Sequence, residues 1–249
     1  MCHSTDSRPP APPVITGQVA EHGRLEITAR DGNRLSAYRT TPTNPNGRNV
    51  VILPDVRGLH PFYEALAHRF AEAGFRAMAI DFYGRSAGTL PRDDSFDPMR
   101  HLALLEAHHV DADVAAAAAR LRREQPGPVF TVGFCLGGGH SWRQAATDLG
   151  LAGAIGFYGP PRFFGQATMA LSAPLLMLLA GDDVATPQAE FQALATGFDQ
   201  AGKTYEMHVY DGAPHSFFDV TFDDWERECT DAWHRILSFT SRNSGQVAA

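Results

Sequence analysis

A cysteine stands between glycines in the stretch Gly133–Gly137, GFCLG, which follows an apolar run and precedes a segment with helical spacing. A nucleophile on a turn between a strand and a helix needs small neighbours, because larger side chains would collide with nearby backbone. The N-terminus of the helix that follows favours negative charge, so it stabilises a thiolate and the oxyanion formed when that thiolate attacks a carbonyl carbon. The pattern therefore indicates nucleophilic catalysis by Cys135.

An acid and a histidine follow Cys135 in the chain order that is typical when a nucleophile stands on such a strand-to-helix turn. Asp183 comes after the apolar run Leu175–Leu179, and His215 comes after Tyr205–Tyr210. In an open parallel sheet the carboxyl ends of the strands meet at one edge, where sites form. His215 can then take the thiol proton and return it to the leaving group, while Asp183 fixes the imidazole tautomer.

Each of these residues also has a purely structural interpretation. A lone cysteine among apolar residues is usually an inert core thiol, an aspartate after a strand often caps the next helix, and a histidine can be a satisfied boundary residue. A dinucleotide site is disfavoured, because the glycines from Gly133 to Gly139 do not spell GxGxxG. The occurrence of Cys135, Asp183 and His215 in this order favours catalysis.

The rest of the sequence predicts the elements that position these residues. From Asn49 onward, apolar runs alternate with helix-period segments, which is typical of parallel strands joined by crossover helices. The predicted strands are Val50–Leu53, Arg76–Ile80, Val129–Val132, Ala154–Tyr158, Leu175–Leu179 and Tyr205–Tyr210. The predicted helices are Phe62–Ala73, Val110–Glu124, Gly138–Asp148, Gln188–Ala201 and Asp223–Phe239.

The N-terminal third adds a hairpin and a tail to this pattern. Leu25–Ala29 and Leu35–Arg39 read as antiparallel strands joined at Asp31-Gly32-Asn33. Residues 1–17 are rich in proline and polar groups, so we expect a mobile tail before a single α/β domain over residues 18–249. The segment from Tyr83 to His109 has no clear period and is a candidate rim for a pocket.

Composition limits the partners of this chain. The 249 residues carry a formal net charge of −7 without a basic run, which argues against nucleic-acid or anionic-membrane surfaces and favours a small-molecule substrate. No segment is typical of a signal peptide or a membrane helix, so we expect a cytoplasmic protein. The three cysteines and the group His101, His108 and His109 match no disulfide framework or metal-ligand spacing. We expect no metal and no cofactor, and the oligomeric state stays open.

Taken together, the motifs resemble those of the dienelactone hydrolases. The resemblance runs from about Val50 to Phe239 and rests on Gly133–Gly138, Gly181–Pro187 and His215–Phe217. It implies an α/β-hydrolase fold, with a mostly parallel central sheet and helices on both faces. It also implies that a cysteine nucleophile, here Cys135 with Asp183 and His215, opens a small ester or lactone.

Further site residues follow from the same resemblance. The backbone N–H groups of Leu136 and Val56 would form the oxyanion hole, and Asp55 stands where the family has a glutamate that contacts the cysteine. Arg85 matches one of two arginines that bind the substrate carboxylate, whereas Asp219 stands where the second is expected.

Arg85, Asp219 and Tyr158 are therefore the expected substrate-binding positions. Because Asp219 would repel a bound carboxylate, we expect a preference for neutral or differently shaped esters and lactones over dienelactone.

Two alternatives stay open at this point. A broader carboxylesterase or thioesterase would share every catalytic residue and differ in the shape of its pocket. A binding or regulatory protein on a hydrolase scaffold is the other, since a fold does not fix a function. Turnover of an activated ester that depends on the Cys135 thiol distinguishes an enzyme from a binding protein.

Overall fold

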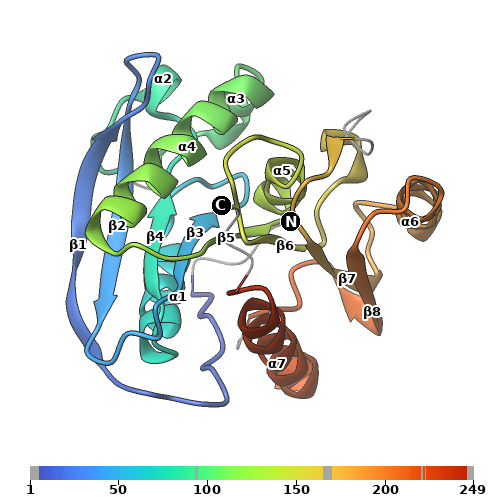
Figure 1. Ribbon diagram of the computed structural model, residues 1–249. Coiled ribbons are helices and arrows are strands. Elements are labelled where there is room, and N and C mark those ends of the chain that lie inside the picture. The colour runs from blue at the N-terminus through green and yellow to red at the C-terminus, as the bar shows by residue number, and fades with distance from the viewer. Residues whose placement is uncertain (1–5, 93–94, 165–169, 220, 222, 246–249) are drawn as a thin grey trace.

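One mixed sheet of eight strands forms the centre of the molecule (Figure 1), in the order β1-β2-β4-β3-β5-β6-β7-β8. The computed structural model describes residues 6–92, 95–164, 170–219, 221 and 223–245. The six parallel strands are β3 (Asn49–Leu53), β4 (Arg76–Ile80), β5 (Val129–Phe134), β6 (Gly153–Phe157), β7 (Leu175–Asp182) and β8 (Tyr205–Pro214). Each predicted strand overlaps one of these six, so the apolar runs were sufficient to locate them.

The antiparallel entry also agrees with the sequence. β1 (Val19–Thr28) and β2 (Arg34–Pro42) form the expected hairpin, and β2 continues the sheet by pairing antiparallel with β4. At the turn, Gly32 has φ 84°. A glycine adopts this left-handed conformation without a steric penalty, which explains its place there.

Helices cover both faces of the sheet (Figure 1), as expected for an α/β-hydrolase fold. Along β3, Val50 and Ile52 lie in one apolar core, while Val51 and Leu53 lie in the other, because successive side chains of a strand point to opposite faces. The first core packs against α1 (Pro61–Glu72) and α7 (Glu226–Arg242), and the second against α4 (Ala107–Glu124), α5 (Leu136–Gln144) and α6 (Gln188–Gln200).

The structure differs from the prediction at α5. This helix begins at Leu136, directly after Cys135, rather than at Gly138, and it ends at Gln144 rather than at Asp148. Glycine is a poor helix former, but a Cβ atom at Gly137 would lie 2.2 Å from the backbone oxygen of Leu53. The glycines therefore allow the start of α5 to lie directly against the end of β3.

The predicted irregular segment from Tyr83 to His109 contains two short helices, α2 (Gly84–Ala87) and α3 (Pro98–Leu102), and the start of α4. Within the described ranges, none of the helices combines the length and the apolar character that crossing a bilayer requires.

The N-terminal segment differs from the mobile tail that we expected. Residues 1–5 lie outside the described residues, and Asp6–Gly17 contains no helix or strand. Nevertheless Ser7, Pro9, Pro10 and Pro12 are buried. The indole N–H of Trp233 in α7 donates to the backbone oxygen of Pro10 at 3.1 Å. Proline rings bury apolar surface and lose little backbone freedom on ordering, which explains why a polar-looking segment packs here.

Candidate active site

Cys135 sits at the turn between β5 and α5 with a strained backbone. Its φ of 51° and ψ of −117° lie outside the regions that non-glycine residues prefer. The turn is tight enough that a Cβ atom at Gly133 would lie 1.9 Å from the backbone oxygen of Gly137. The N–H of Cys135 donates to the oxygen of Phe157 at 3.1 Å, which fixes the turn to the end of β6. The half-buried thiol is thereby held at the carboxyl edge of the sheet.

Asp183 follows β7 and His215 follows β8, and the two side chains meet at the same edge of the sheet. The Nδ1 atom of His215 lies 3.0 Å from both Asp183 carboxylate oxygens. The two side chains are only 7% and 0% exposed. Asp182, the neighbouring carboxylate, is exposed. A carboxylate at Nδ1 holds the proton there and leaves Nε2 as the basic nitrogen, which is the arrangement that a general base needs.

Tyr158 packs against this pair. It follows β6, has φ 38°, and is fully buried. Its ring centroid lies 4.7 Å from that of His215 and 6.4 Å from that of Phe134, the residue before Cys135. Tyr158 therefore supports the imidazole from the side of β5 and β6, while its expected contact with substrate stays a prediction.

A cavity of about 260 Å³ opens beside Cys135. Most of its wall is apolar, and two of its residues, Leu102 and Leu105, come from the segment that we expected to form a pocket rim. The full lining is Val56, Leu102, Leu105, Cys135, Leu136, His140, Pro160, Arg162 and Phe163. A space of this size suits a small substrate rather than an extended chain.

The two candidate oxyanion donors also line this cavity. Leu136 opens α5, so its backbone N–H has no acceptor within the helix. Val56 lies in the loop after β3, where its carbonyl accepts the Tyr83 hydroxyl at 2.6 Å. This hydrogen bond fixes the loop that carries the Val56 N–H.

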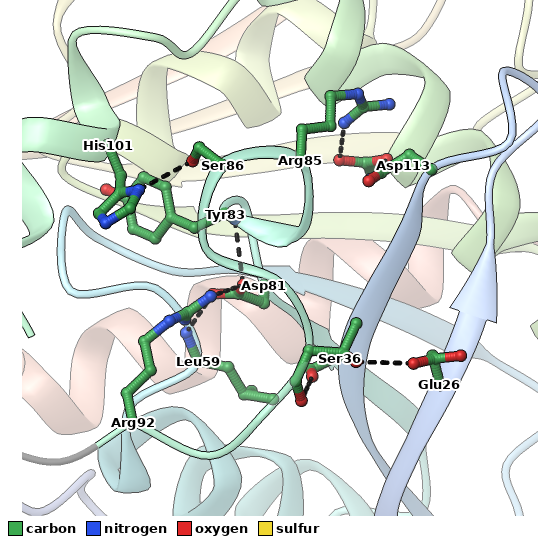
Figure 2. Close-up of polar contacts among 12 residues, drawn as sticks. Glu26, Ser36, Leu59, Asp81, Tyr83, Arg85, Ser86, Arg92, His101 and Asp113 are labelled. Carbon is green, nitrogen blue, oxygen red and sulfur yellow. Dashed lines mark hydrogen bonds and ion pairs between the residues drawn. The ribbon is translucent and has the colours of Figure 1, made fainter.

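Asp81, at the end of β4, ties together the segments around this loop (Figure 2). Its buried carboxylate accepts the N–H groups of Leu59 and Tyr83 at 3.1 and 3.0 Å and pairs with Arg92 at 2.6 Å. The same view shows His101 of α3, whose Nδ1 lies 3.0 Å from the Ser86 hydroxyl. These contacts hold the wall of the cavity to the sheet.

Asp55 forms an ion pair with Arg57. The Nη2 and Nε atoms of Arg57 lie 2.9 and 3.1 Å from the Asp55 carboxylate, which is 1% exposed. Burial opposes the charged guanidinium, but the attraction of Asp55 outweighs it and raises the pKa of Arg57. The expected contact of Asp55 with Cys135 stays a prediction.

Arg85 forms ion pairs with two carboxylates. Its guanidinium donates to Asp113 of α4 at 2.7 Å, as Figure 2 shows, and to Asp31 of the hairpin turn at 2.6 Å. It is absent from the described residues that line the Cys135 cavity. Two carboxylates from other segments therefore engage this guanidinium, and its expected contact with a substrate carboxylate stays a prediction.

Asp219 is also engaged by other parts of the chain. Its fully buried carboxylate accepts the backbone N–H groups of Arg8 and Thr221, both at 3.0 Å. Asp219 is not among the described residues that line the Cys135 cavity. The aspartate braces the N-terminal segment against the loop after His215, and its expected effect on a bound carboxylate stays a prediction.

Two polar residues of the cavity were missed by sequence analysis. His140 is five residues after Cys135 on α5, and Arg162 follows β6 at the carboxyl edge of the sheet. His140 is 2% exposed, whereas Arg162 is exposed, with its Cζ 5.0 Å from the Phe163 ring centroid. His140 follows β5 and Arg162 follows β6, and both strands were predicted. Their places after these strands could therefore have indicated that they lie near the site.

Comparison with known proteins decides the family. The model of the dienelactone hydrolase family matches residues 35–244 of this chain. The chain belongs to this family. Carboxymethylenebutenolidase from Pseudomonas putida is 28% identical over 201 residues, which cover 78% of this chain and 84% of the relative. Carboxymethylenebutenolidase 1 from Cupriavidus pinatubonensis is 34% identical over 142 residues, which cover 54% and 60%.

Solved structures support the same fold. Esterase Pf2001 from Pyrococcus furiosus superposes with a TM-score of 0.62 at 16% identity, covering 90% of this chain and 96% of the esterase. A dienelactone hydrolase-like promiscuous phosphotriesterase, P91, from metagenomic libraries gives a TM-score of 0.68 at 19% identity, with 86% and 98% covered. The chain is thus a dienelactone hydrolase-like ester hydrolase with an α/β-hydrolase fold.

Proposed function

We propose that this dienelactone hydrolase-like enzyme opens a small ester or lactone through an acyl thioester on Cys135. The observation that carries the proposal is the cavity beside Cys135, at the sheet edge where Asp183 pairs with His215. The relatives named carboxymethylenebutenolidase point to the same bond type. A broader carboxylesterase or thioesterase would use the same residues on substrates of another shape.

His215 takes up one proton and returns it in each half of the reaction. In the first half, Nε2 takes the Sγ proton as the thiolate attacks the carbonyl carbon, and the N–H groups of Leu136 and Val56 stabilise the oxyanion. The C–O bond then breaks, and the leaving oxygen takes the proton. In the second half, His215 activates water, which attacks the thioester and regenerates the Cys135 thiol.

Trapping the intermediate tests this proposal. Rapid acid quenching of the enzyme with 4-nitrophenyl acetate should yield a burst of nitrophenol and one acetyl group on the peptide that contains Cys135, because acylation precedes hydrolysis. Peptide mass spectrometry locates the acetyl group. Enzyme alkylated beforehand at Cys135 serves as the control and should show neither signal, whereas a burst that survives this alkylation contradicts the proposal.

Arg162 is expected to favour an anionic substrate. Since its cation lines the cavity while Arg85 and Asp219 are engaged elsewhere, Arg162→Gln should lower kcat/KM for dienelactone about tenfold or more, the loss of one charge-assisted hydrogen bond. The value for an uncharged aryl ester should change little. Steady-state kinetics with both substrates measure the difference.

Arg123→Gln is the matched control, because Arg123 is an exposed arginine at the end of α4. Equal losses for the charged and uncharged substrates, or equal effects of the two variants, would show that Arg162 does not select charge.

A further inference from the structure

His140 brings a polar ring into the otherwise largely apolar wall of the Cys135 cavity. The side chain is 2% exposed, and its Nδ1 atom is buried without a hydrogen-bond partner among the described residues. The neighbouring wall residues Leu136 and Phe163 are apolar. The ring stacks on Phe163, with centroids 4.6 Å apart and an interplanar angle of 26°, and faces Phe82 at 6.0 Å.

The imidazole is neutral at pH 7. Burial is the larger cause, and the positive charge of Arg143 adds to it, so that the pKa of His140 falls to about 4. A neutral imidazole has one N–H donor and one nitrogen acceptor. His140 therefore offers a hydrogen bond of either polarity without adding charge to the cavity.

An unpaired buried polar atom destabilises a folded protein, because it loses its bonds to water and gains none. A leucine at this position would avoid this destabilisation, because the neighbouring wall residues are apolar. Nδ1 has no accessible surface in this orientation, so a ligand in the cavity supplies the missing partner when the imidazole turns toward the cavity that it lines. The cavity that His140 lines also contains Cys135, so the ligand is the part of the substrate held beside the nucleophile.

We propose that His140 is a specificity-determining residue that hydrogen-bonds a hydroxyl group on the acyl part of the substrate. A hydroxyl both donates and accepts, so it pairs with either tautomer of the neutral ring. The small cavity, about 260 Å³, limits this acyl part to a short chain. The inference rests on the proposed function, since acylation of Cys135 is what brings the acyl part to His140.

Two isosteric esters test the proposal. In 4-nitrophenyl 3-hydroxybutanoate a hydroxyl replaces one methyl group of 4-nitrophenyl 3-methylbutanoate. The ratio of kcat/KM for the hydroxy ester to that for the methyl ester should fall at least tenfold in His140→Leu. The methyl ester should react as well as before or better. Comparing ratios between variants removes the difference in intrinsic reactivity between the esters.

Thermal unfolding supplies a second readout. Because His140→Leu removes an unpaired polar group, its melting temperature should equal or exceed that of the wild type while selectivity is lost. A residue needed only for packing would lose stability and activity on both esters together. His234→Leu, at an exposed histidine of α7, is the matched control and should leave the ratio unchanged.

The outcomes separate this inference from the proposed function. An unchanged ratio in His140→Leu overturns the role of His140, and the ring then holds no substrate hydroxyl. If the wild type shows no Cys135-dependent turnover of either ester, the proposed function is overturned instead.

If His140→Leu does not fold, the wild type alone decides. There, 3-hydroxybutanoate should inhibit more strongly than 3-methylbutanoate, and equal inhibition counts against the proposal.

Discussion

Replacing Cys135 with alanine is expected to reduce ester turnover by about 10⁶-fold, the scale of loss when a nucleophile is removed from a triad. The cavity and the strained turn stay in place, because alanine is the smaller side chain and the backbone contact to Phe157 is retained. Initial rates with an activated ester measure the loss, and unaltered thermal unfolding shows that the fold is intact.

Alkylation gives an independent measurement on the same residue. Cys135 should react with iodoacetamide faster than Cys229, which is 3% exposed and donates to the Phe217 oxygen at 3.3 Å. Burial raises the pKa of the Cys229 thiol to about 12, so little thiolate forms there. Cys2, which lies outside the described residues, should also react more slowly than Cys135.

Peptide-resolved labelling follows all three cysteines. If Cys135 reacts no faster than the others and the alanine variant stays active, another residue is the nucleophile.

The second large effect is expected at Asp183. Its carboxylate holds His215 Nδ1 through two contacts of 3.0 Å, so Asp183→Asn should lower kcat by about 10³–10⁴-fold through the wrong imidazole tautomer. The geometry of the site is nearly preserved, because an asparagine side chain has the same shape as that of aspartate. Single-turnover kinetics separate this loss from changes in substrate binding.

Asp182→Asn is the matched control for Asp183→Asn. Asp182 is the adjacent residue with the same side chain, but it is exposed. We expect a change of less than threefold in kcat. A larger loss in Asp182→Asn than in Asp183→Asn would reverse the assignment of the acid.

Sequence patterns located the strands and the residues at their ends for a physical reason. A buried parallel strand needs a continuous apolar run, and the residue that follows it must emerge at the carboxyl edge of the sheet. Asp183 and His215 follow such runs, and the structure brings them into contact. Local chemistry also fixes the turn at Cys135, since only glycine fits at Gly133 and Gly137.

Side-chain partners from distant segments could not be predicted in this way. Arg85 is held by Asp31 and Asp113, and Asp219 by the N–H of Arg8, which is 211 positions away in sequence. None of these three partners belongs to a local pattern, so alignment with a family position could not reveal them. The start of α5 was misplaced by two residues, because the close contact of Gly137 with the end of β3, which lets the helix begin directly after Cys135, is not visible in the sequence.

The docked N-terminal segment has a consequence for how the chain folds. Two of its hydrogen bonds, from the Arg8 N–H to Asp219 and from the Trp233 indole to the Pro10 oxygen, span 211 and 223 positions. Contacts of such long range close slowly, because loop-closure entropy must be overcome before they stabilise anything. Pro10 has no Trp233 partner until α7 has packed. We therefore expect these two bonds to form late in folding, when they brace the loop after His215 through Asp219.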